Sequence, residues 1–246
     1  MKKEELIKKI ESRDEDIVKK TLEEIGNLNI KEAIQPIINL LNKTSSEEII
    51  DAAIWTLSRI APSKQIIPLL KSDNKFIILY TIETLGRIEA KESRAQLREF
   101  LKDPDDEIRA MATWAIGKIQ DKTSYEPLLD ILKNDPNPAV RSNAAWAIKK
   151  LNILNSIKPL KELYQKEDDE MVLYNIQEAI KSIEAYHETF AYTPTFSYKC
   201  PFFSEQCRNL NIQELNFEDK NIIIHINKTD ECDKAKICNL NIKINK

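Results

Sequence analysis

Apolar residues recur at helical spacing along residues 1 to about 186, and the helices that they predict come in pairs. In one well-formed segment, Ala112, Ile116 and Ile119 share a single helix face. The first helix of each pair, called the A helix below, is predicted at 4–11, 31–42, 63–71, 91–102, 122–133 and 155–166. The second, the B helix, is predicted at 15–28, 46–60, 74–88, 105–119, 137–151 and 169–185.

All three glycines of the chain fall at one place near the end of a B helix. Gly26, Gly86 and Gly117 occupy it in the first, third and fourth copies, and other residues occupy it elsewhere. Successive copies of this place lie 32, 28, 31, 32 and 32 residues apart. A fixed period near 30 is typical of stacked two-helix units, none of which can bury its apolar face alone. The pattern therefore predicts one solenoid domain over residues 1–186.

Turn and helix-start residues also return in fixed places. The fourth copy contains Asp103-Pro104-Asp105-Asp106-Glu107-Ile108-Arg109, and the fifth contains Asp135-Pro136-Asn137-Pro138-Ala139-Val140-Arg141. Asp-Pro before a helical pattern indicates a turn followed by an N-cap, and the A helices carry Pro36, Pro68, Pro127 and Pro159. This pattern resembles HEAT repeats, specifically the short class also seen in phycocyanobilin lyases. The resemblance implies a mainly α fold, a right-handed α-α superhelical solenoid of about six repeats.

The resemblance implies a role for two arginines as well. Arg109 and Arg141 match the arginine that bridges acidic turn residues of neighbouring HEAT-like repeats, so we expect both to be structural. Lyase activity would follow from fold analogy alone, because repeats of this class serve scaffolds, adaptors and a few enzymes.

Positions of the B helix that need not be apolar predict a binding surface on the concave side. One column of equivalent positions holds Trp55, Trp114 and Trp146, all the tryptophans of the chain, and glutamate in the other copies: Glu23, Glu83 and Glu178. Offsets of three and four share a helix face. They bring Tyr80 and Met111 to one side of the tryptophan column, and Arg59, Arg87, Lys118 and Lys150 to the other.

A row of cations beside aromatic rings suits an acidic protein or peptide segment with apolar anchors, because tryptophan and arginine often dominate interface energies. Single-stranded nucleic acid stacking on the rings is an alternative. The three glutamates and the net charge of −3 disfavour it. A further alternative is that the tryptophans pack between adjacent B helices and the cations form a solvated row.

The helical pattern stops after His187, and alternation with a period of two takes over. Residues 187–199 are predicted to be a linker and residues 200–246 a small β-meander. Its strands are expected from Leu210 through Phe217 with a bulge, from Ile222 to Ile226, and from Leu240 to Ile244. A sheet of this size buries little core unaided.

All four cysteines lie in this region, as the pairs Cys200/Cys207 and Cys232/Cys238. An up-down-up meander would bring them to one end of the sheet, as a tetrahedral zinc site requires, and the metal would supply folding energy. The pairs are spaced more widely than is usual for zinc ligands. An iron–sulfur cluster, disulfides and free thiols therefore stay open as alternatives.

Composition limits the function further. With 42% hydrophobic and 31% charged residues the chain is ordinary for a globular protein, and no apolar run approaches a membrane span. Met1–Glu5 does not begin a secretory signal, so a cytoplasmic location is expected. The chain has two histidines and no glycine-rich phosphate loop, so it offers few candidate catalytic residues. The predicted function is a non-catalytic adaptor; the alternative is an accessory protein whose cysteines hold an iron–sulfur cluster.

Overall fold

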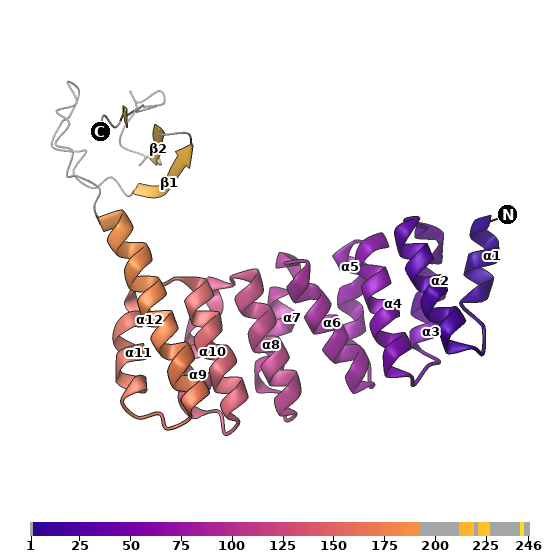
Figure 1. Ribbon diagram of the computed structural model, residues 1–246, viewed down its shortest axis with the longest axis horizontal. Coiled ribbons are helices and arrows are strands. Elements are labelled where there is room, and N and C mark those ends of the chain that lie inside the picture. Colours follow the sequence, from indigo (N-terminus) through magenta and orange to yellow (C-terminus); the bar gives the residue numbers. More distant parts are fainter. Residues whose placement is uncertain (1, 192–211, 219–220, 227–241, 244–246) are drawn as a thin grey trace. The chain divides into compact units, whose positions relative to one another are not determined.

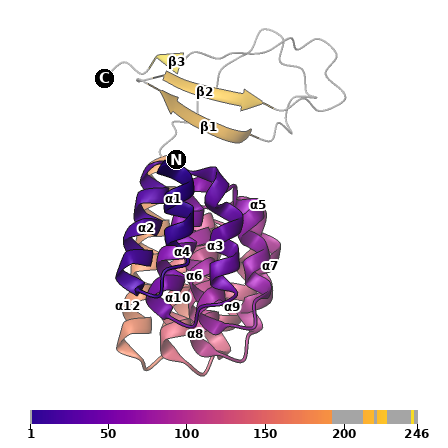
Figure 2. The same cartoon turned by 90° about the vertical axis from the view of Figure 1, so that its right-hand side faces the viewer.

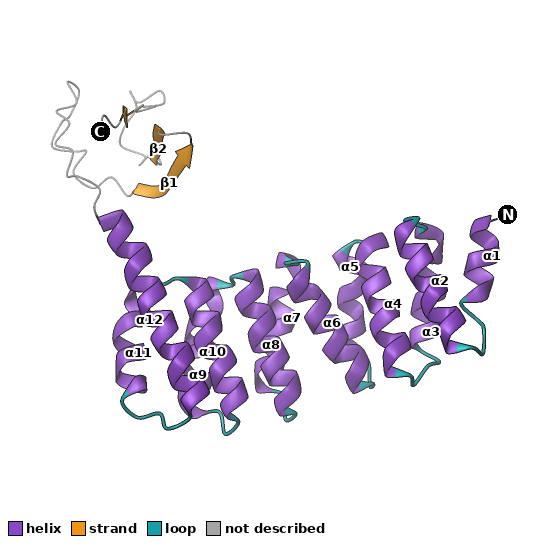
Figure 3. Ribbon diagram, in the orientation of Figure 1, coloured by secondary structure: helices purple, strands orange, loops and turns teal. Residues whose placement is uncertain are grey.

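In the computed structural model, the chain forms two compact units, Met1–Tyr192 and Thr193–Lys246. The structure describes residues 2–191, 212–218, 221–226 and 242–243 (Figure 1). The first unit is a stack of helices joined by short loops (Figure 3). The second contributes three strands.

Five of the six B helices that the structure describes begin after a polar side chain that caps them. The six are α2 (Glu15–Asn27), α4 (Glu47–Ile60), α6 (Lys75–Arg87), α8 (Asp106–Ile119), α10 (Pro138–Leu151) and α12 (Glu170–Ala191). All but α4 have an Asp or Asn in front whose side chain accepts a hydrogen bond from a backbone N–H of the first turn. The Asp-Pro turns thus predicted the starts of α8 and α10 within one residue.

Four B helices end at a residue in the left-handed conformation, namely Asn29, Glu89, Gln120 and Asn152, with φ between 50° and 54°. In the last copy Glu184 stands at this position and remains helical, so α12 continues to Ala191. The predicted end at residue 185 was therefore wrong. The ring Nε2 of His187 lies 3.3 Å from the carbonyl oxygen of Asn152, which connects the extra turns of α12 to the end of α10.

Apart from α1, which begins two residues earlier than predicted, the A helices are shorter in α-helical length than predicted, because 3-10 turns form part of them. They are α1 (Lys2–Lys9), α3 (Ile34–Leu41), α5 (Ser63–Ile66), α7 (Arg94–Glu99), α9 (Tyr125–Asn134) and α11 (Ile157–Tyr164). Pro36, Pro127 and Pro159 lie in the first turn, where a missing N–H costs nothing. Pro68 is the sixth residue of the helical stretch that begins with α5 at Ser63. It cannot donate to the carbonyl of Lys64, so Ile67–Lys71 is a 3-10 helix.

A and B helices form two layers around one apolar core (Figure 2). Seen along the stack, α2, α4, α6, α8, α10 and α12 lie in one layer, and α3, α5, α7 and α9 in the other. The aliphatic position that aligns the copies is fully buried in the first five: Ile25, Leu57, Leu85, Ile116 and Ile148. Each such side chain contributes about 1.5–3 kcal/mol by leaving water.

Two arginines join neighbouring repeats, as their resemblance to the HEAT arginine implied. Arg109 makes two hydrogen bonds, of 2.8 and 3.0 Å, to the carboxylate of Asp135 in the next turn. Arg141 does the same to Glu167 at 2.9 and 2.8 Å. Both pairs are largely buried, and the Arg141 guanidinium holds the pKa of Glu167 below its usual range.

In the second unit, β1 (Ile212–Glu218), β2 (Asn221–Ile226) and β3 (Ile242–Lys243) form one antiparallel sheet in the order β1-β2-β3. The register of β1 shifts between Ile212 and Glu214, where one residue is extra. The predicted cysteine site lies outside the described residues and stays a prediction. Among the described residues, no helix has the length and apolarity that crossing a bilayer requires.

Candidate binding face

The solvent-exposed side of the B helices, called the B-layer face below, carries all the residues predicted to bind a partner. These residues are Trp55 and Arg59 on α4, Tyr80 and Arg87 on α6, Met111, Trp114 and Lys118 on α8, and Trp146 and Lys150 on α10. Their surroundings differ from repeat to repeat.

Trp114 and Trp146 are half-buried, and each lies on a glycine of the preceding B helix. A Cβ added at Gly86 would meet Cζ3 of Trp114 at 2.8 Å, and one added at Gly117 would meet Cζ3 of Trp146 at 2.7 Å. The backbone of Ala115 or Ala147 lies as close. These glycines are therefore present because the next helix approaches closely, not merely because the helix is near its end. The two rings pack between adjacent B helices and still form part of the surface.

Each of these rings has a lysine ammonium over it. Lys118 Nζ lies 6.0 Å from the ring centroid of Trp114, and Lys150 Nζ lies 5.4 Å from that of Trp146. Such a contact is worth about 0.5–1 kcal/mol at an exposed site. No carboxylate forms an ion pair with either lysine in the described part of the chain. Both cations therefore keep donors for an incoming anion.

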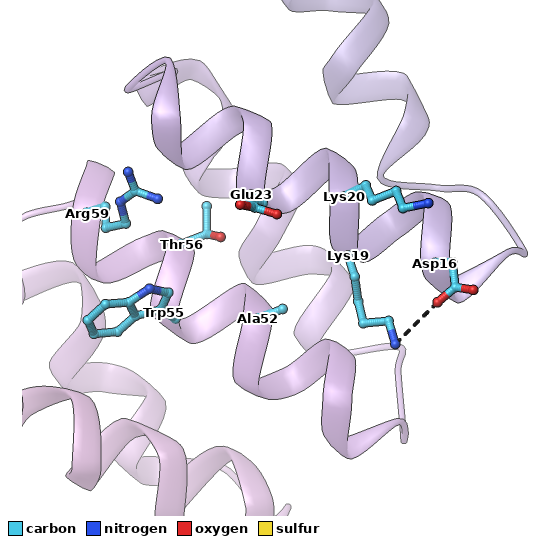
Figure 4. A pocket seen from close by; sticks show the side chains of 8 residues that line it. All are labelled: Asp16, Lys19, Lys20, Glu23, Ala52, Trp55, Thr56 and Arg59. Atoms are coloured by element: carbon cyan, nitrogen blue, oxygen red, sulfur yellow. Dashed lines mark ion pairs between the residues drawn. The ribbon is translucent and has the colours of Figure 1, made fainter.

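Trp55 is the most exposed of the three tryptophans, at 46% of its surface. It lines a hollow of about 420 Å³ between α2 and α4, together with Arg59, Lys20 and Glu23 (Figure 4). Ala52 also lines the hollow, at the position that the larger Tyr80 and Met111 occupy in later repeats.

Arg59 takes the place of a packed tryptophan in this second repeat. Its Nη1 lies 3.0 Å from a Cβ built on Gly26, and its Nη2 donates to Oδ1 of Asn27 at 2.9 Å. The neighbouring Lys19 is paired with Asp16 at 3.4 Å and with Glu48. Arg59 has a neutral partner instead, so its charge is not compensated within the described residues.

The third repeat interrupts the basic row. Arg87 donates to Oε1 of Glu83 on its own helix at 2.6 and 2.9 Å, so its charge is neutralised. Tyr80 donates to Oε1 of Glu47 at 2.6 Å, and this bond raises the pKa of Tyr80. Burial raises the pKa of the nearby Asp51 carboxyl, and the negative charge of Glu83 adds to the effect. The middle of the face is acidic, and its cations lie on either side.

Two polar residues of the face were not singled out from the sequence. Asn143 Nδ2 donates to the carbonyl of Ala110 at 3.0 Å, and Asn175 Nδ2 donates to Oγ of Ser142 at 2.7 Å. Both bonds join successive B helices. The signal was available, because both asparagines occupy the same column as Tyr80 and Met111.

The family comparison agrees with this architecture. The model of HEAT repeats matches residues 63–149 and 125–181. HEAT repeats are therefore detected over residues 63–181. None of the curated proteins compared matches the chain.

Three solved structures with similar helical stacking are 17–21% identical in sequence to this chain. A designed armadillo repeat protein in complex with the peptide (KR)4 is 21% identical, with a TM-score of 0.47 over 73% of this chain and 98% of that one. An engineered protein is 20% identical, with a TM-score of 0.47 over 75% and 97%. The complex of CpcE and CpcF of phycocyanin lyase from Nostoc sp. PCC7120 is 17% identical, with a TM-score of 0.38 over 74% and 82%.

The described residues of the helical stack assemble no metal site. In the described part of the chain, no group of three or more His, Cys, Asp or Glu side chains is placed to hold an ion. What the face offers is binding chemistry: aromatic surface, ammonium and guanidinium donors, and one hollow.

Proposed function

We propose that this protein is an adaptor whose HEAT stack binds a protein segment bearing acidic and apolar side chains across the B-layer face. The observation that carries the proposal is the pairing of uncompensated cations with tryptophans. Arg59, Lys118 and Lys150 form no ion pair with a carboxylate among the described residues, and each stands one helical turn after a tryptophan.

The energetics favour a ligand of this kind. A carboxylate placed on Lys118 or Lys150 gains a charge-assisted hydrogen bond without displacing an existing partner. An apolar side chain beside Trp55 removes from water a ring that is 46% exposed. Aromatic and cationic anchors of this kind dominate the energies of many interfaces.

A nucleic acid strand fits the face less well. Its phosphates would pass the acidic middle formed by Glu47, Asp51 and Glu83. The burial-raised pKa of Asp51 indicates that negative charge is already disfavoured there. A phosphate backbone cannot leave out a charge, whereas a peptide can place a neutral or basic residue at that repeat.

The test uses the full chain and two labelled peptides, one alternating glutamate with leucine and the other alternating lysine with leucine. Fluorescence anisotropy should show binding of the acidic peptide alone, and binding should weaken as salt rises, because exposed charges are screened beyond about 8 Å at physiological ionic strength. The double variant Lys118→Glu/Lys150→Glu should weaken binding by about tenfold or more.

The matched control is Lys122→Glu/Lys133→Glu, which reverses the charge of two exposed lysines of the A layer. It changes the net charge equally and should leave affinity near the wild-type value. Equal losses in both double variants, equal binding of both peptides, or no binding of the acidic peptide would contradict the proposal. Tighter binding of a single-stranded oligothymidylate than of the acidic peptide would favour the nucleic-acid alternative.

A further inference from the structure

One stripe of each B helix faces the following repeat. In α8 the stripe includes Asp106, which accepts a hydrogen bond from Asn137, and Ala110, whose carbonyl accepts from Asn143. It ends at Gly117, which meets Trp146. These positions, with one more between the last two, have the spacing i, i+4, i+7 and i+11 of a single helix face.

Other B helices use the same stripe. At its first position, Glu47 accepts a hydrogen bond from Tyr80 at 2.6 Å, and Lys75 pairs with Asp105 at 2.7 Å. At its third position, the carbonyl of Leu22 accepts from Thr56 at 3.1 Å. The stripe is therefore the surface by which one HEAT repeat holds the next.

In α12 no other helix among the described residues packs on this stripe. Its four residues are Glu170, Tyr174, Gln177 and Lys181, and all are exposed. Within the described residues no helix follows α12, and Ile180 is only partly buried although its counterparts in the five earlier repeats are fully buried. Tyr174 is 64% exposed and the adjacent Met171 is 63% exposed. Terminal repeats of solenoids usually carry a polar outer face. This stripe combines the charged Glu170 and Lys181 with the large exposed ring of Tyr174, and Met171 is exposed beside it.

We propose that this stripe binds the same stripe of a second copy of the chain, with the two α12 helices antiparallel about a twofold axis. The reason is that the stripe is self-complementary in that arrangement. An axis between residues 175 and 176 sets Glu170 opposite Lys181 of the second copy and Tyr174 opposite Gln177, and the same pairs recur on the other side.

The charges around the stripe agree with this pairing. A shallow hollow at the start of α12 is lined by three carboxylates and two large side chains: Asp168, Asp169, Glu170, Met171 and Tyr174. In the antiparallel arrangement it would receive the ammonium of the second copy's Lys181. Among the described residues, the one ion pair of Lys181 is with Glu178, at 3.5 Å, and 61% of its side chain is exposed. A twofold contact of this kind closes at two copies, whereas packing the stripe on the first repeat of another copy would give an open filament.

The first test is sedimentation of the full chain over a dilution series. The chain should pass from dimer to monomer on dilution, and Tyr174→Asp should raise the dimer dissociation constant by about tenfold or more. Leu28→Asp is the matched control, because Leu28 is likewise a large exposed residue, at 50%, but lies in the first repeat. Circular dichroism of both variants establishes that the helices persist.

A charge exchange tests the antiparallel geometry. Glu170→Lys and Lys181→Glu should each weaken the dimer, because each places like charges opposite one another at both ends of the contact. The two substitutions together should restore it. A wild-type chain that is monomeric at every soluble concentration, equal effects of Tyr174→Asp and Leu28→Asp, or a double variant weaker than either single variant would overturn the proposal. None of these outcomes bears on the proposed peptide binding, whose residues lie on α4, α6, α8 and α10.

Discussion

At the scale of single residues, the distance between neighbouring B helices depends on a pairing of large and small side chains. Gly86 is followed in the next repeat by Trp114, and Gly117 by Trp146, with 2.8 and 2.7 Å between a built Cβ and the ring. Lys149 stands at the same place one repeat later, and it is followed by Glu178, to which its ammonium lies 3.6 Å away. At Gly86 and Gly117 the absence of a side chain on glycine makes room for the tryptophan ring of the next repeat.

This pairing predicts opposite outcomes for two similar substitutions. Gly86→Ala should lower the free energy of unfolding by about 1–3 kcal/mol, because the ring and backbone of the next repeat must move. Gly26→Ala meets only the flexible Arg59 side chain, so the gain in helix propensity of up to about 1 kcal/mol should dominate. Urea denaturation of both variants checks this. A stabilising Gly86→Ala would contradict the close contact.

Trp114 and Trp55 should differ in whether they contribute mainly to stability or mainly to binding. Trp114→Ala removes a ring packed on Gly86 and should cost about 2 kcal/mol or more of stability. Trp55→Ala removes an exposed ring and should cost about 1 kcal/mol or less while weakening binding of the acidic peptide. Thermal unfolding and anisotropy on the same preparations compare the two. Equal stability losses would mean that Trp55 is part of the core.

Sequence periodicity predicted that the three tryptophans share a column but left their packing open. A shared column fixes the side of the helix on which the tryptophans lie. Whether a ring is packed depends on the size of the residue that it meets in the preceding repeat. Gly86 lets Trp114 approach, and Arg59 covers Gly26 in place of a ring. The pairing of Arg87 with Glu83 could have been predicted from their spacing of four residues, but Arg87 was assigned to the basic row instead.

At the scale of elements, repeats are joined by the buried pairs Arg109–Asp135 and Arg141–Glu167. Their spacing was visible because each arginine follows an Asp-Pro turn by the same number of residues. The extra turns of α12 were not predictable from the period, since they depend on Glu184 remaining helical and on the contact of His187 with Asn152.

The second pair predicts a pH dependence of stability. Arg141 lowers the pKa of Glu167 in the folded state, so the pair stabilises the fold above the ordinary glutamate pKa of about 4.3 and stops doing so as pH falls through the lower folded value. Glu167→Gln should cost about 3 kcal/mol at neutral pH, because Arg141 is left buried without its partner. The difference from wild type in urea midpoints should shrink below about pH 4. A difference that is constant down to acid pH would contradict this assignment.

At the scale of the whole molecule, stability of the HEAT stack comes from contacts between neighbouring repeats, so it should not depend on the C-terminal cysteines. Protein prepared under reducing conditions is expected to carry about one zinc equivalent on Cys200, Cys207, Cys232 and Cys238. A strong chelator should make residues after 191 sensitive to protease while the helical circular dichroism stays unchanged.

Four outcomes separate the alternatives for those cysteines. Zinc by metal analysis supports the prediction, and brown protein absorbing in the visible range supports an iron–sulfur cluster. Two intact disulfides in mass spectrometry, or four freely titrating thiols in the folded chain, would each exclude the zinc site.

The adaptor account depends most on where a ligand contacts the stack, and the tryptophans allow that to be observed directly. All three indoles of the chain lie on the B-layer face, so the indole N–H signals of the ¹⁵N-labelled full chain report on that face alone, each assigned by a Trp→Phe variant. Titration with the glutamate–leucine peptide should shift all three signals, with the largest change at the exposed Trp55. Saturable binding of that peptide with all three indole signals unmoved would contradict the account.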